Sequence, residues 1–335
     1  MTPEQLKASI LQYAIQGKLV EQKLEEGKAE EFYQQIQEEK QKLIKEGKIK
    51  KEKPLTEITE DEIPFDIPES WKWCRLSQII DVRDGTHDSP KYVSEGVPLV
   101  TSKNLRNGTI DYGNIKYITQ ADADKINERS AVSDDDILFA MIGSIGNPVL
   151  VKKDREFCIK NMALFKKYEN TEVDMNYMYW FFYFVQYSLK SEASGGVQSF
   201  ISLTRFREYP FPLPPLKEQL RIVAKIEELL PYVERYAEAY EKLEQFNTKF
   251  PEDMKKSILQ YAIQGKLVEQ SPEEGTAEDL YKSIQEEKQK LIKEGKIKKE
   301  KPLAEITEDE IPFDIPESWK WVKLGECINL LSGQD

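Results

Sequence analysis

A long segment of this chain occurs twice. Residues 3–76 return as residues 251–324, and 61 of the 74 aligned positions are identical. A unit of this length exceeds the roughly 20–50 residues of stacked repeat proteins, so the chain is not a solenoid. The repeat instead predicts a reused scaffold segment on either side of one unrepeated block, roughly residues 77–250. The last residues, 325–335, resemble the beginning of a second such block, because Gly333 aligns with Gly85 at the same offset.

The charge of the chain is unevenly distributed. The net charge is −12, which argues against a nucleic-acid partner for the chain as a whole. Residues 72–215, however, hold 18 Lys and Arg against 18 Asp and Glu, so the unrepeated block is neutral. A neutral block can still present one basic face. The excess acid lies in the repeats and helices, where we expect it to face solvent or protein partners.

The cysteines and apolar stretches narrow the class of protein. Cys74, Cys158 and Cys327 show no paired spacing, so the sequence predicts neither a disulfide framework nor a zinc site. The longest apolar stretch, residues 178–185, is too short to span a bilayer. The first residues lack the basic and then apolar pattern of a signal peptide. We therefore expect a cytoplasmic protein.

Each copy of the repeat contains two predicted helices. Thr2 is a favourable N-cap, and Gln5 completes a capping box for a helix that ends near Gly17. A second, highly charged helix is predicted over residues 29–46. Its thin apolar stripe consists of Phe32, Ile36 and Leu43.

The unrepeated block mixes strands with short helices. The run 97–100 predicts a strand, and Pro98 places it at a sheet edge or makes this the beginning of a strand. Residues 137–142 and 147–151 predict two strands around a Gly-Ser-Ile-Gly turn. Residues 177–189 predict a buried helix whose aromatic side chains belong to the core. These elements predict an α+β fold.

The clearest periodic pattern follows this block. Apolar residues alternate steps of four and three over three heptads, which is typical of a coiled coil. From residue 216 to residue 246 such a helix would be about 45 Å long. Pro231 lies inside it and predicts a kink, because the pattern keeps its phase across the proline. This spacer seam consists of Ile222, Ile226, Leu229, Val233, Tyr236, Tyr240 and Leu243.

Catalytic signatures are missing from the sequence. It contains no glycine-rich phosphate loop and no adenosyl-methionine loop, and His87 is the only histidine. Asp154 and Glu156, followed by Lys160, faintly resemble a nuclease metal site. Carboxylates two residues apart are common by chance, so we predict no catalytic residue and no metal site.

Four polar turns, most of them containing glycine, remain in the unrepeated block, at 84–91, 101–108, 143–146 and 195–200. Lys and Arg side chains pair with guanine, Asn and Gln with adenine, and Ser and Thr with either base. Each turn taken alone is equally typical of an ordinary surface loop. Together they predict a DNA-binding set of Thr86, His87, Lys91, Ser102, Lys103, Asn104, Arg106, Ser144, Gln198, Ser199 and Arg205.

Three segments carry a resemblance to a known family. Residues 212–223 resemble the junction that follows each target recognition domain in specificity (S) subunits of type I restriction-modification systems. Residues 258–267 resemble the end of that family's long spacer helix. Residues 67–73 resemble the entry into a recognition domain. Their order and spacing match over essentially the whole chain.

The resemblance implies a mixed α/β target recognition domain with long coiled-coil spacer helices, in a half-length form with one recognition domain. The boundaries it predicts are an N-terminal helical repeat and linker, the recognition domain, a spacer helix, and a second linker with the start of a second recognition domain. The respective ranges are 1–62, 63–215, 216–268 and 269–335.

The resemblance also implies a non-catalytic reader of double-stranded DNA. The chain itself would carry no cofactor, because S-adenosylmethionine chemistry would come from partner methyltransferase (M) subunits. A motor nuclease (R) subunit would join them. Since there is one recognition domain, we expect two chains to pair through the spacer seam and read a bipartite site. A coiled-coil protein-interaction scaffold without DNA binding, and a nuclease built on Asp154 and Glu156, remain alternatives at this point.

Overall fold

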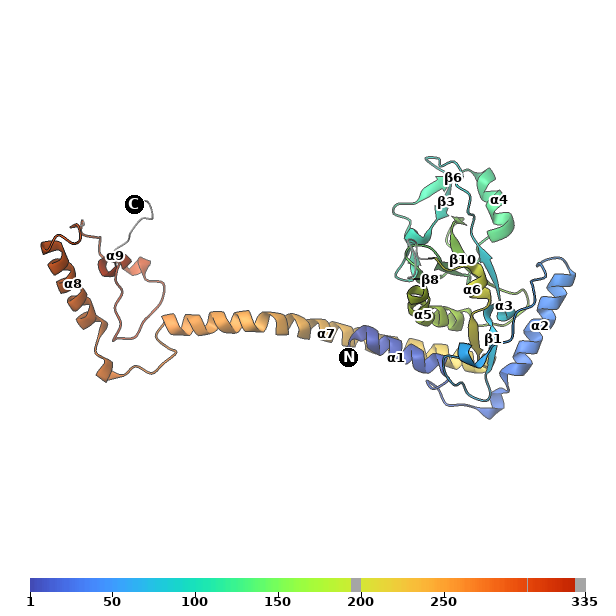
Figure 1. Cartoon of the computed structure of the whole chain (residues 1–335), viewed down its shortest axis with the longest axis horizontal. Coiled ribbons are helices and arrows are strands. Elements are labelled where there is room, and N and C mark those ends of the chain that lie inside the picture. Colours follow the sequence, from blue (N-terminus) through green and yellow to red (C-terminus); the bar gives the residue numbers. More distant parts are fainter. Residues whose placement is uncertain (194–199, 300, 329–335) are drawn as a thin grey trace. The chain divides into compact units, whose positions relative to one another are not determined.

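The computed structural model describes residues 1–193, 200–299 and 301–328. The chain forms two compact units, residues 1–240 and residues 241–335. One helix, α7 (Leu216–Ile263), contributes residues to both units (Figure 1). Within the described residues, no helix is both long enough and apolar enough to cross a membrane.

The first unit begins with the first copy of the repeat. Helix α1 (Pro3–Ile15) begins after Thr2, and the predicted capping box with Gln5 is confirmed. Helix α2 (Ala29–Lys45) buries the predicted stripe of Phe32, Ile36 and Leu43. Two short 3₁₀ turns, Leu24–Glu26 and Glu60–Glu62, lie before and after α2.

A two-stranded pairing closes the unrepeated block at its two ends. Strand β1 (Lys72–Arg75) pairs antiparallel with β11 (Pro210–Leu213), which brings the entry and exit of the block together. Four helices connect the remaining strands. They are α3 (Leu76–Ile79), α4 (Gln120–Ser130), α5 (Met175–Glu192) and α6 (Leu203–Arg207).

A four-stranded sheet forms the centre of the block, in the order β2-β10-β7-β8. Its strands are Ile80–Asp84, Met162–Lys167, Ile137–Ala140 and Gly146–Leu150. Helix α5 packs on this sheet, and the rings of Phe165 and Phe182 stack with centroids 4.1 Å apart. The aromatic side chains of α5 are thus mostly core, as the sequence predicts, and the mixed helices and strands confirm the α+β class.

A smaller three-stranded sheet has the order β6-β3-β9. Strand β3 (Val97–Val100) lies between β6 (Lys116–Ile118) and β9 (Cys158–Ile159). Of the two positions predicted for Pro98, the sheet edge is therefore wrong, whereas the beginning of a strand agrees with its place as the second residue of β3. The proline is tolerated because β9 pairs only with Leu99 and Val100, beyond Pro98. Next to this sheet a short hairpin joins β4 (Leu105–Arg106) to β5 (Thr109–Ile110).

Helix α7 runs without a break past Pro231, as predicted, and also past Pro251. The first half of the spacer seam is already packed within the first unit. Ile222, Ile226 and Val233 are buried within the first unit, where α1 lies beside α7 (Figure 1). Farther along the helix, Leu243 is 54% exposed.

The second unit repeats the local structure of the first copy. Helix α8 (Ala277–Lys293) follows the 3₁₀ turn Pro272–Glu274, and α9 (Leu324–Cys327) follows the 3₁₀ turn Glu308–Glu310. The Ala277 amide donates to the Ser318 carbonyl at 2.8 Å, which matches the 2.8 Å bond between the equivalent Ala29 and Ser70.

Candidate nucleic-acid interface

A groove of about 750 Å³ opens between two loops of the unrepeated block, and most of the residues that line it are polar or charged. One wall is the segment from Thr101 to Asp111, which contains the 3₁₀ turn Ser102–Asn104 and the β4–β5 hairpin. The opposite wall contains Gly143 and Ser144. Of the eleven predicted residues, the groove therefore gathers five, from two separate turns. They are Ser102, Lys103, Asn104, Arg106 and Ser144.

The hairpin has a two-residue turn with a specific backbone requirement. Asn107 and Gly108 have φ angles of 50° and 73°, the conformation that Asn-Gly adopts in tight hairpins. The Thr109 hydroxyl donates to the Arg106 carbonyl at 3.0 Å and braces the turn. Arg106, which lines the groove, and Asn107 next to it are both exposed.

The groove carries an excess of positive charge. Lys103, Arg106, Lys116 and Lys160 line it, against the single carboxylate of Asp111. The Arg106–Asp111 ion pair is long, at 3.7 Å, and both side chains are exposed. Such a pair contributes little to stability, so the guanidinium of Arg106 can exchange its partner for a phosphate or a base edge.

His87 lies beside this groove in a hydrogen-bonded corner. Its ring nitrogens are 2.8 Å from the buried carboxylate of Asp84 and 2.9 Å from the side chain of Asn161, which lines the groove. Arg129 forms an ion pair with the same Asp84. Because both ring nitrogens have partners within the protein, His87 is better suited to fixing the loop than to reading a base.

Thr86 and Lys91 lie in the same loop as His87. The Thr86 hydroxyl accepts a hydrogen bond from the Asp88 amide at 3.1 Å, so this side chain stabilises its own turn. Lys91 is exposed and adjoins Tyr92, whose side chain lines the groove. Of the two, Lys91 is the one placed to reach a phosphate.

Asn104, which is predicted to read a base, has a buried side chain that is hydrogen-bonded within the protein. It is 7% exposed, and its side-chain oxygen accepts from the Thr101 amide at 2.9 Å. Its side-chain nitrogen donates to the Asp111 carbonyl at 2.9 Å. The side-chain amide of Asn104 therefore helps to hold the wall of the groove.

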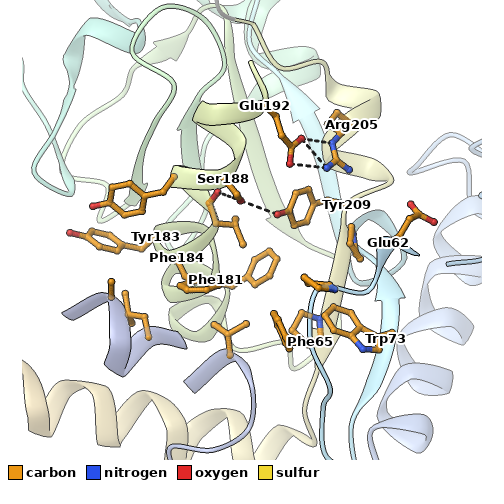
Figure 2. Close-up of a pocket in the computed structure, with 18 of the residues that line it drawn as sticks. Glu62, Phe65, Trp73, Phe181, Tyr183, Phe184, Ser188, Glu192, Arg205 and Tyr209 are labelled. Carbon is orange, nitrogen blue, oxygen red and sulfur yellow. Dashed lines mark hydrogen bonds and ion pairs between the residues drawn. The ribbon is translucent and has the colours of Figure 1, made fainter. Parts of the chain in front are cut away.

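Arg205 lies elsewhere in the first unit. It forms an ion pair with Glu192 at 2.9 Å and lies over the ring of Tyr209 (Figure 2). These residues line a different and mostly apolar cavity of about 600 Å³ between α1, the linker and α5. The structure does not bring Arg205 to the groove. Gln198 and Ser199 lie outside the described residues.

Sequence reasoning missed several residues that line the groove. Lys116 comes from β6, and its ammonium lies 4.2 Å from the ring centroid of Tyr92. Lys160 and Asn161 follow β9, and Asn161 adopts a φ of 54°. Neither segment contains a glycine turn of the kind from which the other candidate residues were predicted. The available signal was a Lys-Asn pair directly after a strand, at a position that tolerates a left-handed backbone.

The two carboxylates considered for a nuclease are engaged with neighbours. Asp154 pairs with Arg155 at 2.9 Å, and the hydrogen bond from Arg155 lowers the pKa of Asp154. Glu156 accepts from Asn127 at 3.4 Å. Among residues 1–193, 200–299 and 301–328, no three His, Cys, Asp or Glu side chains are grouped so that they could hold a metal ion.

The described structure is thus a block of mixed helices and strands with a basic groove, followed by a long helix. The family model described as "Type I restriction modification DNA specificity domain" matches residues 68–245, which is more than half of the chain. The chain belongs to this family. The matched segment covers all elements from β1 to β11, which are called the recognition block from here on, and the first part of α7.

Two curated relatives from Escherichia coli extend the similarity. The chain is 30% identical over 384 residues to the type I restriction enzyme EcoAI specificity subunit, covering 98% of this chain and 63% of that protein. It is 31% identical over 385 residues to the EcoEI specificity subunit, covering 97% of this chain and 62% of that protein. The chain thus spans less than two thirds of the length of these relatives.

Among solved structures, the chain is similar to the HsdS subunit from Thermoanaerobacter tengcongensis. The TM-score is 0.42 at 18% identity, and the match covers 61% of this chain and 47% of that chain.

Proposed function

We propose that this chain is the DNA specificity subunit of a type I restriction-modification system and that its groove contacts the target duplex. The observation that carries this proposal is the convergence of four cationic side chains on one groove of a block that is neutral overall. The chain itself performs no chemistry in this proposal. It positions partner subunits on their target.

The side chains of the groove divide by chemistry into two groups. Lys103, Lys116 and Lys160 are suited to phosphate contacts, which supply affinity but no sequence information. Arg106, at the tip of the hairpin, is suited to bidentate pairing with guanine in the major groove, which admits a two-stranded ribbon. Ser144 faces it from the opposite wall and can pair with either base type.

The partners follow from the family. Methyltransferase subunits would bring S-adenosylmethionine, and a motor nuclease subunit would join in restriction, all in the cytoplasm. The names of the relatives, which are specificity subunits of type I restriction enzymes, support this assembly. The second half of the spacer seam, where Leu243 is 54% exposed, supports the pairing of two chains, which would read a bipartite site.

The test is DNA binding by the full chain together with its methyltransferase, measured by fluorescence anisotropy over a series of salt concentrations. We expect Lys103→Ala to weaken binding to all duplexes and to reduce the salt slope by about one unit. We expect Arg106→Ala to cost about 1–3 kcal/mol on the target and to relax discrimination at one base pair. Lys45→Ala in α2 is the charge-matched control and should leave both quantities unchanged.

If DNA affinity and its salt slope changed equally in all three variants, the groove would not be the interface with DNA. Binding that does not weaken with rising salt would contradict the whole proposal, because phosphate contacts release counterions. That second outcome would instead favour a protein-interaction scaffold.

A further inference from the structure

A second cleft, of about 710 Å³, opens on the first unit and shares no lining residue with the groove described above. Residues of the segment 48–52 and of α2, β2, α4 and α6 line it, and α2 and α4 lie on the same side of the unit (Figure 1). Seven Lys and Arg side chains face four carboxylates there. The cations are Lys40, Lys48, Lys50, Arg83, Lys125, Arg129 and Arg207, and the carboxylates are Glu52, Asp81, Asp84 and Glu128.

Most carboxylates of the second cleft are already neutralised by cations beside them. The pairs are Asp81 with Arg83 at 2.7 Å, Glu52 with Lys40 at 3.0 Å and with Arg207 at 3.3 Å, and Asp84 with Arg129. The acidic side chains thus hold the arginines of the cleft in place and leave an excess of positive charge.

Lys50 and Lys125 supply the part of this charge that remains available. Both side chains are exposed, and neither forms an ion pair within the residues that the structure describes. Lys48, by contrast, pairs with Glu169 outside the cleft at 2.9 Å. The ammonium groups of Lys50 and Lys125 come from separate elements, and both can bind an anion that enters the cleft.

Two guanidinium groups of the cleft are held in fixed orientations. Arg207 donates to the Val82 carbonyl at 3.0 Å, and Arg83 donates to the Arg129 carbonyl at 3.3 Å. A guanidinium group that is fixed in this way loses little conformational entropy when its remaining N–H groups bind a phosphate. The second cleft therefore combines oriented and mobile donors.

The second cleft adjoins the groove through the corner formed by His87. Asp84 lines the cleft, and Asn161 lines the groove. The ring of His87 is hydrogen-bonded to both, at 2.8 Å and 2.9 Å, so little more than one imidazole ring separates the two rims. The His87 side chain is 59% exposed. A ligand that lies in the groove can therefore continue over His87 into the cleft.

We propose that the second cleft binds the phosphate backbone of DNA beside the base pairs that the groove reads. The inference rests on the proposed function, because it gives the same duplex a second point of contact. One strand carries a phosphate about every 3.4 Å, so a strand that passes over His87 reaches the cleft within a few nucleotides. Phosphates are the same at every base pair, so this contact adds affinity and orients the duplex without reading sequence.

Size and composition favour a backbone over a free phosphate ion. The cleft of about 710 Å³ is much larger than one phosphate group, and its cations come from five segments of the chain. Lys125 and Arg129 lie in the second half of α4, away from the helix N-terminus that would attract a single anion. Binding thus depends on long side chains that can follow a row of phosphates.

Removal of single charges tests the contact in the full chain bound to its methyltransferase. Fluorescence anisotropy would use two duplexes of about 40 base pairs with unrelated sequences, over a series of salt concentrations. Lys50→Ala and Lys125→Ala should each reduce the salt slope by about 0.9 and weaken binding roughly five- to tenfold near 0.1 M salt. The loss should be equal on both duplexes, because the contact is independent of sequence.

The repeat provides a matched control for Lys50. Its equivalent in the second copy is Lys298, which lies in the same run Lys-Ile-Lys, so Lys298→Ala removes the same charge from the same local sequence. No residue of the recognition block lines the groove that contains Lys298. Lys298→Ala should therefore leave affinity and salt slope unchanged. A loss as large as that of Lys50→Ala would overturn the inference, because net charge alone would then explain both.

Acetylation followed by mass spectrometry separates the two sources of phosphate. In the same complex, added duplex should protect Lys125 of the second cleft and Lys103 of the groove from acetic anhydride. Lys45, which lines neither, should react as before. Inorganic phosphate at the same ionic strength should protect neither Lys103 nor Lys125. Protection of Lys125 by inorganic phosphate but not by duplex would overturn the backbone contact.

The two protected lysines also distinguish failure of this inference from failure of the proposed function. Protection of Lys103 without Lys125, with unchanged salt slopes in the cleft variants, would refute the second contact and leave the groove as the interface. If duplex protected neither lysine, the proposed function itself would be refuted.

Discussion

The two copies of the repeat share most of their sequence and differ in what covers them. In the first copy, Ile36 and Leu43 of α2 are 1% and 2% exposed and lie in the core cluster with Tyr168 of the recognition block. In the second copy, the equivalent Ile284 and Leu291 of α8 line an open groove of about 250 Å³. The same local helices thus form in both copies, and the apolar stripe of α2 is buried where it packs against the recognition block.

The contacts within each copy are the same in both. Gly17 and Gly265 have φ angles of 68° and 67°, and each lies directly against a proline ring, Pro68 or Pro316. The turn after the helix is therefore set by residues of the copy itself. Comparing equivalent substitutions in the two copies separates these local contacts from the docking contacts.

The largest difference is expected for the helix that begins each copy, where Leu11 is 2% exposed and the equivalent Leu259 is 55% exposed. Leu11→Ala should lower the free energy of unfolding of the first unit by about 2–5 kcal/mol, because it leaves a cavity in the core. Leu259→Ala, at an exposed position, should change it by less than about 0.5 kcal/mol in dilute solution. Denaturant unfolding followed by tryptophan fluorescence measures both. Equal losses would mean that the second copy is docked as well.

The turns should respond equally, which is the opposite pattern. Gly17→Ala and Gly265→Ala each force a side chain into the left-handed region, at a cost of about 1–2 kcal/mol, and against a proline ring. Hydrogen exchange should show loss of protection over residues 15–30 in one variant and 263–278 in the other. A response in the first copy alone would show that the recognition block, and not the copy, sets the turn.

The linker differs chemically between the copies. Arg75 is 3% exposed and forms a bidentate ion pair with Glu62, at 2.6 and 2.8 Å, and it donates to the Glu208 carbonyl at 2.7 Å. The equivalent Lys323 makes one bond to Glu310, at 2.7 Å. The arginine thus connects the linker to the recognition block, and the lysine connects the linker only to itself.

Arg75→Lys should therefore make the first copy resemble the second. We expect a loss of about 1–2 kcal/mol in the first unit, since lysine cannot reproduce the bidentate pair and the bond to Glu208 together. Lys323→Arg is the matched control and should be neutral within about 0.5 kcal/mol. Urea midpoints of the two variants check this, and a neutral Arg75→Lys would show that the fork geometry contributes little.

The helices and their buried stripes were predictable because their signals are local. The capping box of Thr2, the stripe of α2 and the phase of the heptads across Pro231 depend on neighbours a few residues away. The partner of the spacer seam was not predictable. No local pattern indicates that Leu11 of α1, 211 residues earlier in the chain, belongs to the same core cluster as Ile222.

The groove was predictable in part for the same reason. The polar turn at 101–108 identified Lys103 and Arg106. The same turn contains Asn104, and only the structure reveals that its side chain completes the capping box of the 3₁₀ turn. Lys116 lies in β6 and Lys160 directly follows β9, and both strands pair with β3, one antiparallel and one parallel. Tertiary pairing of this kind leaves no periodic trace in the sequence.

The smallest expected effect concerns the pH dependence of the two linkers. The hydrogen bonds from Arg75, then from the Thr59 backbone, lower the pKa of Glu62 to about 2 from an ordinary value of 4.5. A carboxyl with a lowered folded-state pKa contributes stability that is fully present above 4.5 and is lost as the pH falls towards 2. The difference in stability between the native chain and Glu62→Gln should therefore narrow over this range.

The equivalent pair provides the control for this pH effect. The hydrogen bond from Lys323 lowers the pKa of Glu310 in the same direction, but the lysine contributes one bond where the arginine contributes two. Glu310→Gln should thus show a narrowing of the same sign and smaller size. Urea midpoints measured from pH 5 down to pH 2 would reveal both. A larger effect at Glu310 than at Glu62 would mean that the arginine fork is not what distinguishes the docked linker from the undocked one.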